Sequence, residues 1–426
     1  MSHVSSPPIA DSRSRNSLWK ALGPGILVAA AAVGGSHLVW STRAGALYGW
    51  SLLGLVLLAN VLKFPFFLYG QRYTAATGES LLDGYKRQGA GYVWTFFAIN
   101  ILTGTINIAA VAMLTGALLS GYGLDASVPI LTVGTLVVCA LLVLVGRYAV
   151  LDTLAKLVIA MLTVGTVLAV ALAVGSADSA AVVDAVQAPS VWTWASFGFL
   201  VSLLGWMPMP IDLSAWSSLW MFERSAQTGH MATVRESSID FYVGYGAAVV
   251  LAILFLSLGT LVMHPTGQTF SAGGVGFSNE FVALYTQTIG DWSRPLILTA
   301  AFVTMFSTTL TCVDGYPRSL AACCTLLFPV DRSRFGGIHL AWVLASVVGA
   351  IGIVLLLTSS LLALLTFAAV VSFVTSPVLA WINLRVMRGD NVPVTDRPGS
   401  VLLAISWAGL AFFSLMTLGF LYTLIT

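Results

Sequence analysis

Apolar residues are gathered into long runs that are separated by short polar connections. Each run approaches the ~20 residues that a helix needs to cross the hydrocarbon of a bilayer. The longest connections, 176–191 and 265–292, have room for no more than a short surface helix. The pattern predicts an all-α membrane protein with about eleven transmembrane helices, near 22–46, 51–74, 92–120, 128–146, 152–175, 192–222, 238–263, 293–322, 337–357, 361–384 and 400–425.

The first predicted span is interrupted in its middle. Residues 23–45 read GPGILVAAAAVGGSHLVWSTRAG, in which Gly34, Gly35, Ser36 and His37 interrupt the helix. Polar backbone at bilayer depth is tolerated only where it is buried in protein or lines a wet cavity. This break is therefore a candidate binding site.

The sixth predicted span carries a second break. In residues 198–220, GFLVSLLGWMPMPIDLSAWSSLW, Pro208 and Pro210 bracket Met209, and Asp212 follows. Each proline removes a backbone donor and clashes with the preceding turn. Paired breaks at corresponding positions of two halves indicate the substrate site of a transporter. We expect two inverted five-helix repeats, with the first and sixth helices unwound, and one extra C-terminal helix.

Composition and charge agree with a membrane protein. Charged residues make up 8% of the chain, where soluble proteins carry about 25%, and the mean hydropathy is +0.92. With the N-terminus in the cytoplasm, all of the 19 Lys and Arg residues except Arg43, Lys63 and Arg294 fall on the cytoplasmic side. This distribution predicts a plasma (inner) membrane protein with an external C-terminus. Topology explains the net charge of +2, which gives no sign of nucleic-acid binding.

Three regions follow from this pattern. Residues 1–18 are rich in Ser and Pro and are expected to be a disordered cytoplasmic segment. Residues 19–387 would form the ten-helix core, and residues 388–426 a loop and the eleventh span. Four cysteines lie in or next to apolar segments without metal or disulfide spacing, so we interpret them as small core residues.

The chain resembles the Nramp family of metal-ion transporters. The run GPGILVAAAAVGGSHLVWSTRAGALYGWSLL is similar to the family's first span, MPID resembles the Met-Pro-His motif of its sixth, and FSTTLTCVDGY resembles its eighth. The resemblance extends from Gly23 to about Met387. It implies the LeuT-type fold, and a transporter rather than an enzyme.

The departures from the family pattern concern the metal site. Gly34 stands where the family has its metal-binding Asp, and His37 stands where it has its metal-binding Asn. The family's sixth-span His is replaced by Ile211. In the third span, Gly104 and Asn107 stand where the family carries acidic residues linked to proton movement. The resemblance thus implies that both the metal site and the proton pathway are lost.

The remaining groups at the breaks suit an anion better than a divalent cation. Mn²⁺ and Mg²⁺ prefer carboxylate and carbonyl oxygens, whereas an unwound Gly-Gly before a half-helix offers free N–H groups and the positive end of a helix dipole. Glycine also lets a small ligand approach the backbone. The candidate substrate-binding residues are Gly34, Gly35, Ser36, His37, Asn107, Pro208 and Met209.

The identity of the anion comes from resemblance. Bicarbonate is favoured because the first span is similar to that of a bicarbonate-carrying branch of the superfamily. The residues themselves leave nitrate, formate or a neutral polar solute open. They also leave open that His37 simply bonds a neighbouring carbonyl.

Import of an anion against the membrane potential requires a coupling cation. An inside-negative potential opposes each imported negative charge by about 2.3 kcal/mol per 100 mV, and sodium is the expected partner. In LeuT-type transporters, hydroxyls in the eighth span bind Na⁺ together with first-span carbonyls. Here these groups would be the hydroxyls of Ser307, Thr308 and Thr309, with the carbonyls of Ala32, Val33 and Gly35.

Asp212 lies close to the second break, and intramembrane acids are functional candidates by default. It could coordinate the cation, pair with Arg43 or Lys63, or cap the half-helix that follows it. We favour capping, because an Asp directly before LSAWSS suits an N-cap.

Other classes of protein fit less well. No catalytic set is visible, since four of the five histidines fall at ends or in loops. A channel would need a continuous pore, whereas paired broken helices indicate alternating access. The alternative is a divalent metal transporter of altered selectivity, with Met209 and Asp212 as remaining ligands. We expect a monomer or weak oligomer, with Na⁺ and no other cofactor or resident metal.

Overall fold

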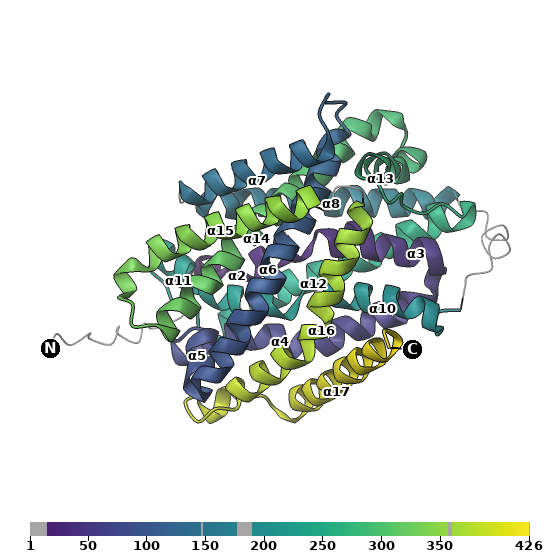
Figure 1. The fold of residues 1–426 in the computed structure, drawn as a ribbon. Helices are drawn as coiled ribbons and strands as arrows, with labels where there is room; N and C mark the ends of the chain where they lie inside the picture. Colours follow the sequence, from purple (N-terminus) through teal and green to yellow (C-terminus); the bar gives the residue numbers. More distant parts are fainter. Residues whose placement is uncertain (1–14, 146–147, 177–189, 357–359, 426) are drawn as a thin grey trace.

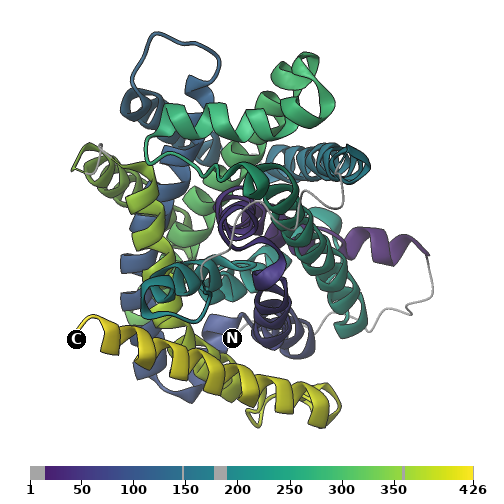
Figure 2. The same ribbon diagram turned by 90° about the vertical axis from the view of Figure 1, so that its right-hand side faces the viewer.

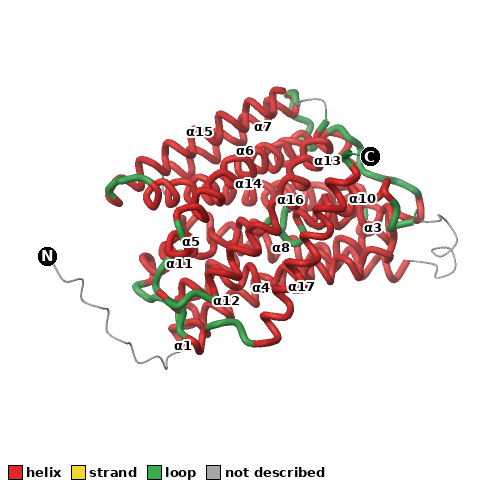
Figure 3. Tube along the Cα trace, turned by 60° about the horizontal axis from the view of Figure 1, so that its bottom comes forward, coloured by secondary structure: helices red, strands yellow, loops and turns green. Residues whose placement is uncertain are grey.

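A computed structural model describes residues 15–145, 148–176, 190–356 and 360–425, and these ranges are nearly all helix, with no strand (Figures 1 and 3). Residues 1–14 of the predicted disordered segment lie outside the described residues. The last four, 15–18, begin the short helix α1 (Arg15–Ala21), so the disorder predicted for them is wrong.

The helices of the first half follow the predicted spans closely. A broken first span is followed by four helices, with a short helix, α5, between the second and third spans. Their bounds are α2 (Pro24–Ala32), η1 (Ser36–Ser41), α3 (Thr42–Tyr48), η2 (Gly49–Leu52), α4 (Leu53–Thr77), α5 (Leu81–Gln88), α6 (Ala90–Ser120), α7 (Val128–Leu144) and α8 (Tyr148–Ser176).

The second half repeats this plan. A broken sixth span is followed by four more spans, with a surface helix, α13, in the long connection, and one further helix ends the chain. Their bounds are α10 (Trp194–Trp206), η3 (Ile211–Leu213), α11 (Ser214–Thr228), α12 (Val234–Leu258), η4 (Gly259–Met263), η5 (His264–Thr266), α13 (Gly274–Ile289), η6 (Asp291–Ser293), α14 (Arg294–Leu327), η7 (Arg332–Arg334), α15 (Phe335–Leu356), α16 (Leu361–Met387), η8 (Val394–Asp396) and α17 (Ser400–Thr423).

Length and hydropathy support the predicted number of spans. Within the described residues, eight helical stretches are long and apolar enough to cross a membrane, and two shorter apolar helices, Val128–Leu144 and Ala160–Gly175, accompany them. One of the eight, Ser36–Thr77, joins the second half of the first span to the second span, and α2 supplies the first half. These segments match the eleven predicted spans.

The two broken spans lie side by side at the centre of the molecule. α2 packs against α11, and α10 packs against η1, so the two breaks face each other. α6 and α14 pack on one another beside the breaks, and α12 packs against α2. Seen from one end, the first span lies inside the ring of other helices, whereas α17 lies on the outside (Figure 2).

Glycines allow α2 and α12 to cross at very short range. A Cβ on Gly244 would lie 2.1 Å from the carbonyl oxygen of Gly25, and a Cβ on Gly25 would lie 2.3 Å from the carbonyl oxygen of Asp240. The carboxylate of Asp240 also accepts hydrogen bonds from the N–H groups of Gly23 (3.0 Å) and Gly25 (2.5 Å). A negative group at the positive end of α2 stabilises that helix.

The two ends of the molecule differ in charge. The end that carries α1 and α5 is rich in basic side chains, among them Lys86, Arg87 and Arg224. The opposite end carries α13 and acidic residues such as Glu280 and Asp291. α1 lies at the first end and α17 ends at the second, as an odd number of spans requires (Figure 1).

Candidate functional site

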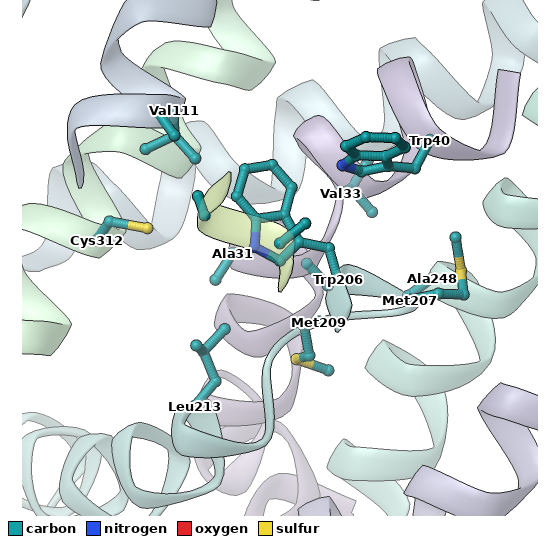
Figure 4. Packing of buried hydrophobic residues seen from close by; sticks show 14 of the residues in the cluster. Ala31, Val33, Trp40, Val111, Trp206, Met207, Met209, Leu213, Ala248 and Cys312 are labelled. Carbon is teal, nitrogen blue, oxygen red and sulfur yellow. The ribbon is translucent and has the colours of Figure 1, made fainter. Parts of the chain in front are cut away.

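A small cavity lies where the two breaks meet α6 and α14. The space open to the centre of a water molecule is about 30 Å³, enough for about two waters or one small ion. Figure 4 shows the indole of Trp206 projecting among the labelled side chains. The lining residues are Ala31, Ala32, Gly35, Ser36, Asn107, Val111, Trp206, Pro208, Met209, Pro210, Leu213, Thr308, Cys312 and Tyr316.

The first break leaves two backbone donors free beside this cavity. α2 ends at Ala32, and the Gly34 N–H turns back to donate to the Ala32 carbonyl (2.9 Å). The Gly34 carbonyl accepts from the N–H groups of His37 (3.1 Å) and Leu38 (2.9 Å). In the part of the chain that the structure describes, the N–H groups of Gly35 and Ser36 meet no backbone or side-chain acceptor. Both residues line the cavity and start a continuous helical segment, so the two donors can serve a ligand.

Close packing explains why the break contains two glycines. A Cβ on Gly34 would lie 2.9 Å from Cγ2 of Thr308, and a Cβ on Gly35 would lie 2.4 Å from Cζ3 of Trp206. Real Cβ atoms do not approach other atoms this closely, so any side chain would force α14 or the indole away. The two glycines therefore bring the two breaks and α14 together.

His37 faces away from the cavity. Its ring is fully buried, and Nε2 lies 2.8 Å from the carbonyl oxygen of Ala248 on α12. Nδ1 lies 2.6 Å from the Ser36 hydroxyl and 3.1 Å from the Ala32 carbonyl, and the same hydroxyl lies 2.5 Å from that carbonyl. Because a carbonyl only accepts, Nε2 carries the hydrogen. The structure thus uses the donors of His37 and Ser36 within the protein, and it leaves Gly34 outside the cavity lining. Gly35 already has helical backbone angles, and Ser36 and His37 belong to the helical turn of η1. The unwound part is therefore shorter than predicted and covers residues 33 and 34.

A polar network from α6 crosses the cavity wall. The Asn107 amide accepts a hydrogen bond from Trp206 Nε1 (3.1 Å) and donates to the Tyr316 hydroxyl (2.7 Å). It also donates to the Ser372 hydroxyl at 3.2 Å. The structure thus places Asn107 in the lining, together with Pro208 and Met209, as the sequence predicts. Its amide fixes the orientation of the indole.

Oxygen atoms converge on Thr308 beside the first break. Its hydroxyl lies 3.1 Å from the Ala30 carbonyl, 3.2 Å from the Val33 carbonyl and 3.1 Å from the Thr304 carbonyl. One hydroxyl hydrogen can satisfy only one of these acceptors at a time. The hydroxyl of Ser307 is buried and has no partner among the described residues. This cluster of oxygen atoms is suited to a small monovalent cation.

Two groups predicted to bind this cation are bonded to other partners. The Thr309 hydroxyl pairs with Thr115 on α6 (2.8 Å) and donates to the Met305 carbonyl. The Ala32 carbonyl already accepts from Ser36 and Gly34. Val33 and Thr308 lie together, and the structure adds the Ala30 and Thr304 carbonyls, which were not predicted for this group.

Asp212 does not cap α11, so the favoured expectation for this residue is wrong. The N-cap position of α11 is Leu213, and no side chain bonds the first turn. The Asp212 side chain is 2% exposed; Oδ2 accepts from the Thr103 hydroxyl (3.0 Å), and Oδ1 has no partner among the described residues. Within those residues, no ion pair joins Asp212 to Arg43 or Lys63. Arg43 instead lies over the rings of Trp40 and Phe199.

Several lining residues were not assigned to the site from sequence. Among them, Cys312 was interpreted as a core residue, and no substrate role was predicted for Trp206 or Tyr316. Thr308, Cys312 and Tyr316 are spaced by four along α14, which places them on one face of that helix. Residues four and eight positions after Thr308 share its face of the helix, so the same periodicity could have identified Cys312 and Tyr316 from the sequence.

A charged cluster lies between the cavity and the α5 end. Arg318 donates to both carboxylate oxygens of Asp314 (2.7 and 3.0 Å) and to Glu223 of α11 (2.5 Å). Trp220 Nε1 also donates to Asp314 at 3.1 Å. These bonds tie α11 to α14 on this side of the cavity.

Comparisons with known proteins agree on one family. The sequence model described as natural resistance-associated macrophage protein-like (Nramp) matches residues 25–423. An uncharacterized protein of Pasteurella multocida (strain Pm70) is 40% identical over 411 residues, which cover 95% of this chain and 93% of that protein.

Solved structures support the same fold. Two variants of a manganese transporter from Eremococcus coleocola superpose with TM-scores of 0.68 and 0.69 at 16% identity. Each match covers 97% of this chain and 88% of the transporter chain.

Proposed function

Because the chain belongs to the Nramp family of membrane transporters, we propose that it imports a small inorganic oxyanion, bicarbonate first, by alternating access between its two broken helices. The observation that carries this proposal is the absence of any carboxylate from the cavity lining, within the described residues, together with the two free N–H groups of Gly35 and Ser36. An N–H pair at a helix start stabilises negative charge. The cavity is small enough to admit an ion of a few atoms and exclude larger solutes.

Sodium is the proposed coupling ion. The carbonyls of Ala30, Val33 and Thr304 surround the Thr308 hydroxyl and supply uncharged oxygen ligands, and the buried hydroxyl of the neighbouring Ser307 is a further candidate ligand. In transporters of this architecture, unwound carbonyls at half-helix ends bind Na⁺. Thr308 itself belongs to the cavity lining, so a bound cation would also attract an anion in the cavity.

The charge difference between the two ends supports the proposed orientation. Basic residues at the α5 end would face the cytoplasm. The N-terminus would then be cytoplasmic and the C-terminus external, in the plasma membrane. For the oligomeric state, we propose a monomer or a weak oligomer.

A metal transporter is the second candidate. The sulfur atoms of Met209 and Cys312 both belong to lining residues, and thioether and thiolate are metal ligands. The structural relatives are manganese transporters. However, Mn²⁺ and Mg²⁺ prefer oxygen ligands, and no group of three His, Cys, Asp or Glu that could hold a metal occurs among the described residues.

Transport by purified protein in liposomes tests the proposal. Uptake of ¹⁴C-bicarbonate would be measured at alkaline pH, where less of the carbon is CO₂, under an inward sodium gradient and under a matched choline gradient. Protein-free liposomes give the passive leak. We expect uptake that depends on sodium. Sodium-independent Mn²⁺ uptake without bicarbonate uptake would favour the second candidate and reject the first.

A further inference from the structure

A fully buried lysine lies behind the second break. Lys63, on α4, is 0% exposed, and its ammonium donates three hydrogen bonds. The acceptors are the carbonyl oxygens of Leu204 (2.7 Å), Gly205 (3.0 Å) and Met209 (2.9 Å). An ammonium has three N–H donors, so every donor is used.

The three acceptors are created by the break itself. Leu204 and Gly205 belong to the last turn of α10, whose carbonyls have no partner further along the helix, and Met209 lies in the non-helical link. Unpaired carbonyls at bilayer depth need a partner from elsewhere in the protein. These oxygens also form the negative end of the half-helix dipole, which favours a positive charge.

Three carbonyl oxygens converging on one point at 2.7–3.0 Å form a binding site for a monovalent cation. We propose that Lys63 is a tethered cation, which permanently fills a carbonyl site at the second break that an exchangeable cation would otherwise occupy. Met209 belongs to the cavity lining, so this fixed charge lies directly behind the cavity wall.

The fixed charge bears on which ions the cavity accepts. Asp212 is the buried acid nearest in sequence to the link, and one of its carboxylate oxygens has no partner among the described residues. With Lys63 in place, the positive and negative charges at the second break balance. Without it, the second break keeps three unpaired carbonyls and the negative charge of Asp212, which together favour a cation. The effect of Lys63 on ion selectivity rests on the proposed anion transport, whereas its role as a tethered cation does not.

Chemical rescue separates this role from packing. Lys63→Ala removes the ammonium and leaves a space, whereas Lys63→Met fills the space with an uncharged chain. Lys86→Met, at an exposed site on α5, is the control for loss of one positive charge. Each full-length protein is solubilised and purified in ammonium chloride and, separately, in N-methyl-D-glucamine chloride, and thermal melting is recorded in both.

We expect Lys63→Ala to melt well below wild type in N-methyl-D-glucamine and to recover in a saturable manner with ammonium. Wild type, Lys63→Met and Lys86→Met should not respond. A Lys63→Ala protein that is equally stable in both salts, or that is recovered in neither, would overturn the proposal.

Uptake measurements distinguish this proposal from the transport function. Ammonium rescue of melting without bicarbonate uptake by wild type would leave the tethered cation standing and reject the anion substrate. Bicarbonate uptake by wild type without ammonium rescue would reject the tethered cation and leave the anion substrate standing. If both hold, Lys63→Met should lose bicarbonate uptake although it remains folded.

Discussion

Replacing Thr308 with Val tests the coupling site most directly. Valine keeps the branched shape and removes the hydroxyl that lies 3.1–3.2 Å from the carbonyls of Ala30, Val33 and Thr304. Two consequences follow: a bound cation loses one ligand, and a buried carbonyl loses its donor. A buried polar group without a partner costs about 1–3 kcal/mol.

The loss of the hydroxyl as a ligand sets the expected change in sodium dependence. A hydroxyl ligand that contributes about 1–3 kcal/mol to sodium binding corresponds to a change of roughly 5- to 150-fold in the binding constant. The sodium concentration for half-maximal bicarbonate uptake should rise by that factor. Uptake at saturating sodium should change less, because the N–H donors of Gly35 and Ser36 are intact.

The assay is a sodium titration of initial uptake in liposomes, with Thr308→Ser as the control that retains the hydroxyl. Ser307→Ala should act in the same direction, since its hydroxyl is buried without a partner among the described residues. Thr309→Val should not, because that hydroxyl pairs with Thr115 instead. An unchanged half-maximal concentration in Thr308→Val would refute the assignment of the coupling site.

Three further variants probe the first span. Gly34→Asp should abolish bicarbonate uptake. Gly34→Ala, whose Cβ would lie 2.9 Å from Thr308 Cγ2, should only slow uptake. Equal uptake rates in the two variants would exclude the negative charge as the cause. His37→Ala should lower the melting temperature through loss of the bond to Ala248 but leave the half-saturating bicarbonate concentration unchanged, and a large change there would return His37 to the substrate site. Asp240→Asn should destabilise the protein by about 1 kcal/mol in chemical denaturation, because the amide no longer offers a full negative charge to the start of α2; undiminished stability would contradict this.

The spans and both breaks were predictable because they depend on local chemistry. Apolar runs of membrane length specify the helices, and paired prolines or glycines interrupt them wherever they fall. Their corresponding positions in the two halves then related the two breaks to each other. The family resemblance located the eighth-span hydroxyls, of which Thr308 does lie against the first break.

The directions of individual side chains were not predictable in this way. His37 faces α12 because it meets the Ala248 carbonyl, which lies 211 residues further along the chain. Asp212 turns to Thr103 on α6, and the sequence around Asp212 resembles an N-cap regardless of that partner. Such choices depend on which helices surround a residue, and a local pattern carries no information about them.

The crossing of α2 and α12 constrains how the transporter can move. With the Gly25 carbonyl 2.1 Å from where a Gly244 Cβ would be, the two backbones are interlocked, and neither can slide along the other past the larger neighbouring side chains. α2 and α12 must then swing as a single lever. Movement of that lever would bend the first span at residues 33 and 34, directly before Gly35, which lines the cavity.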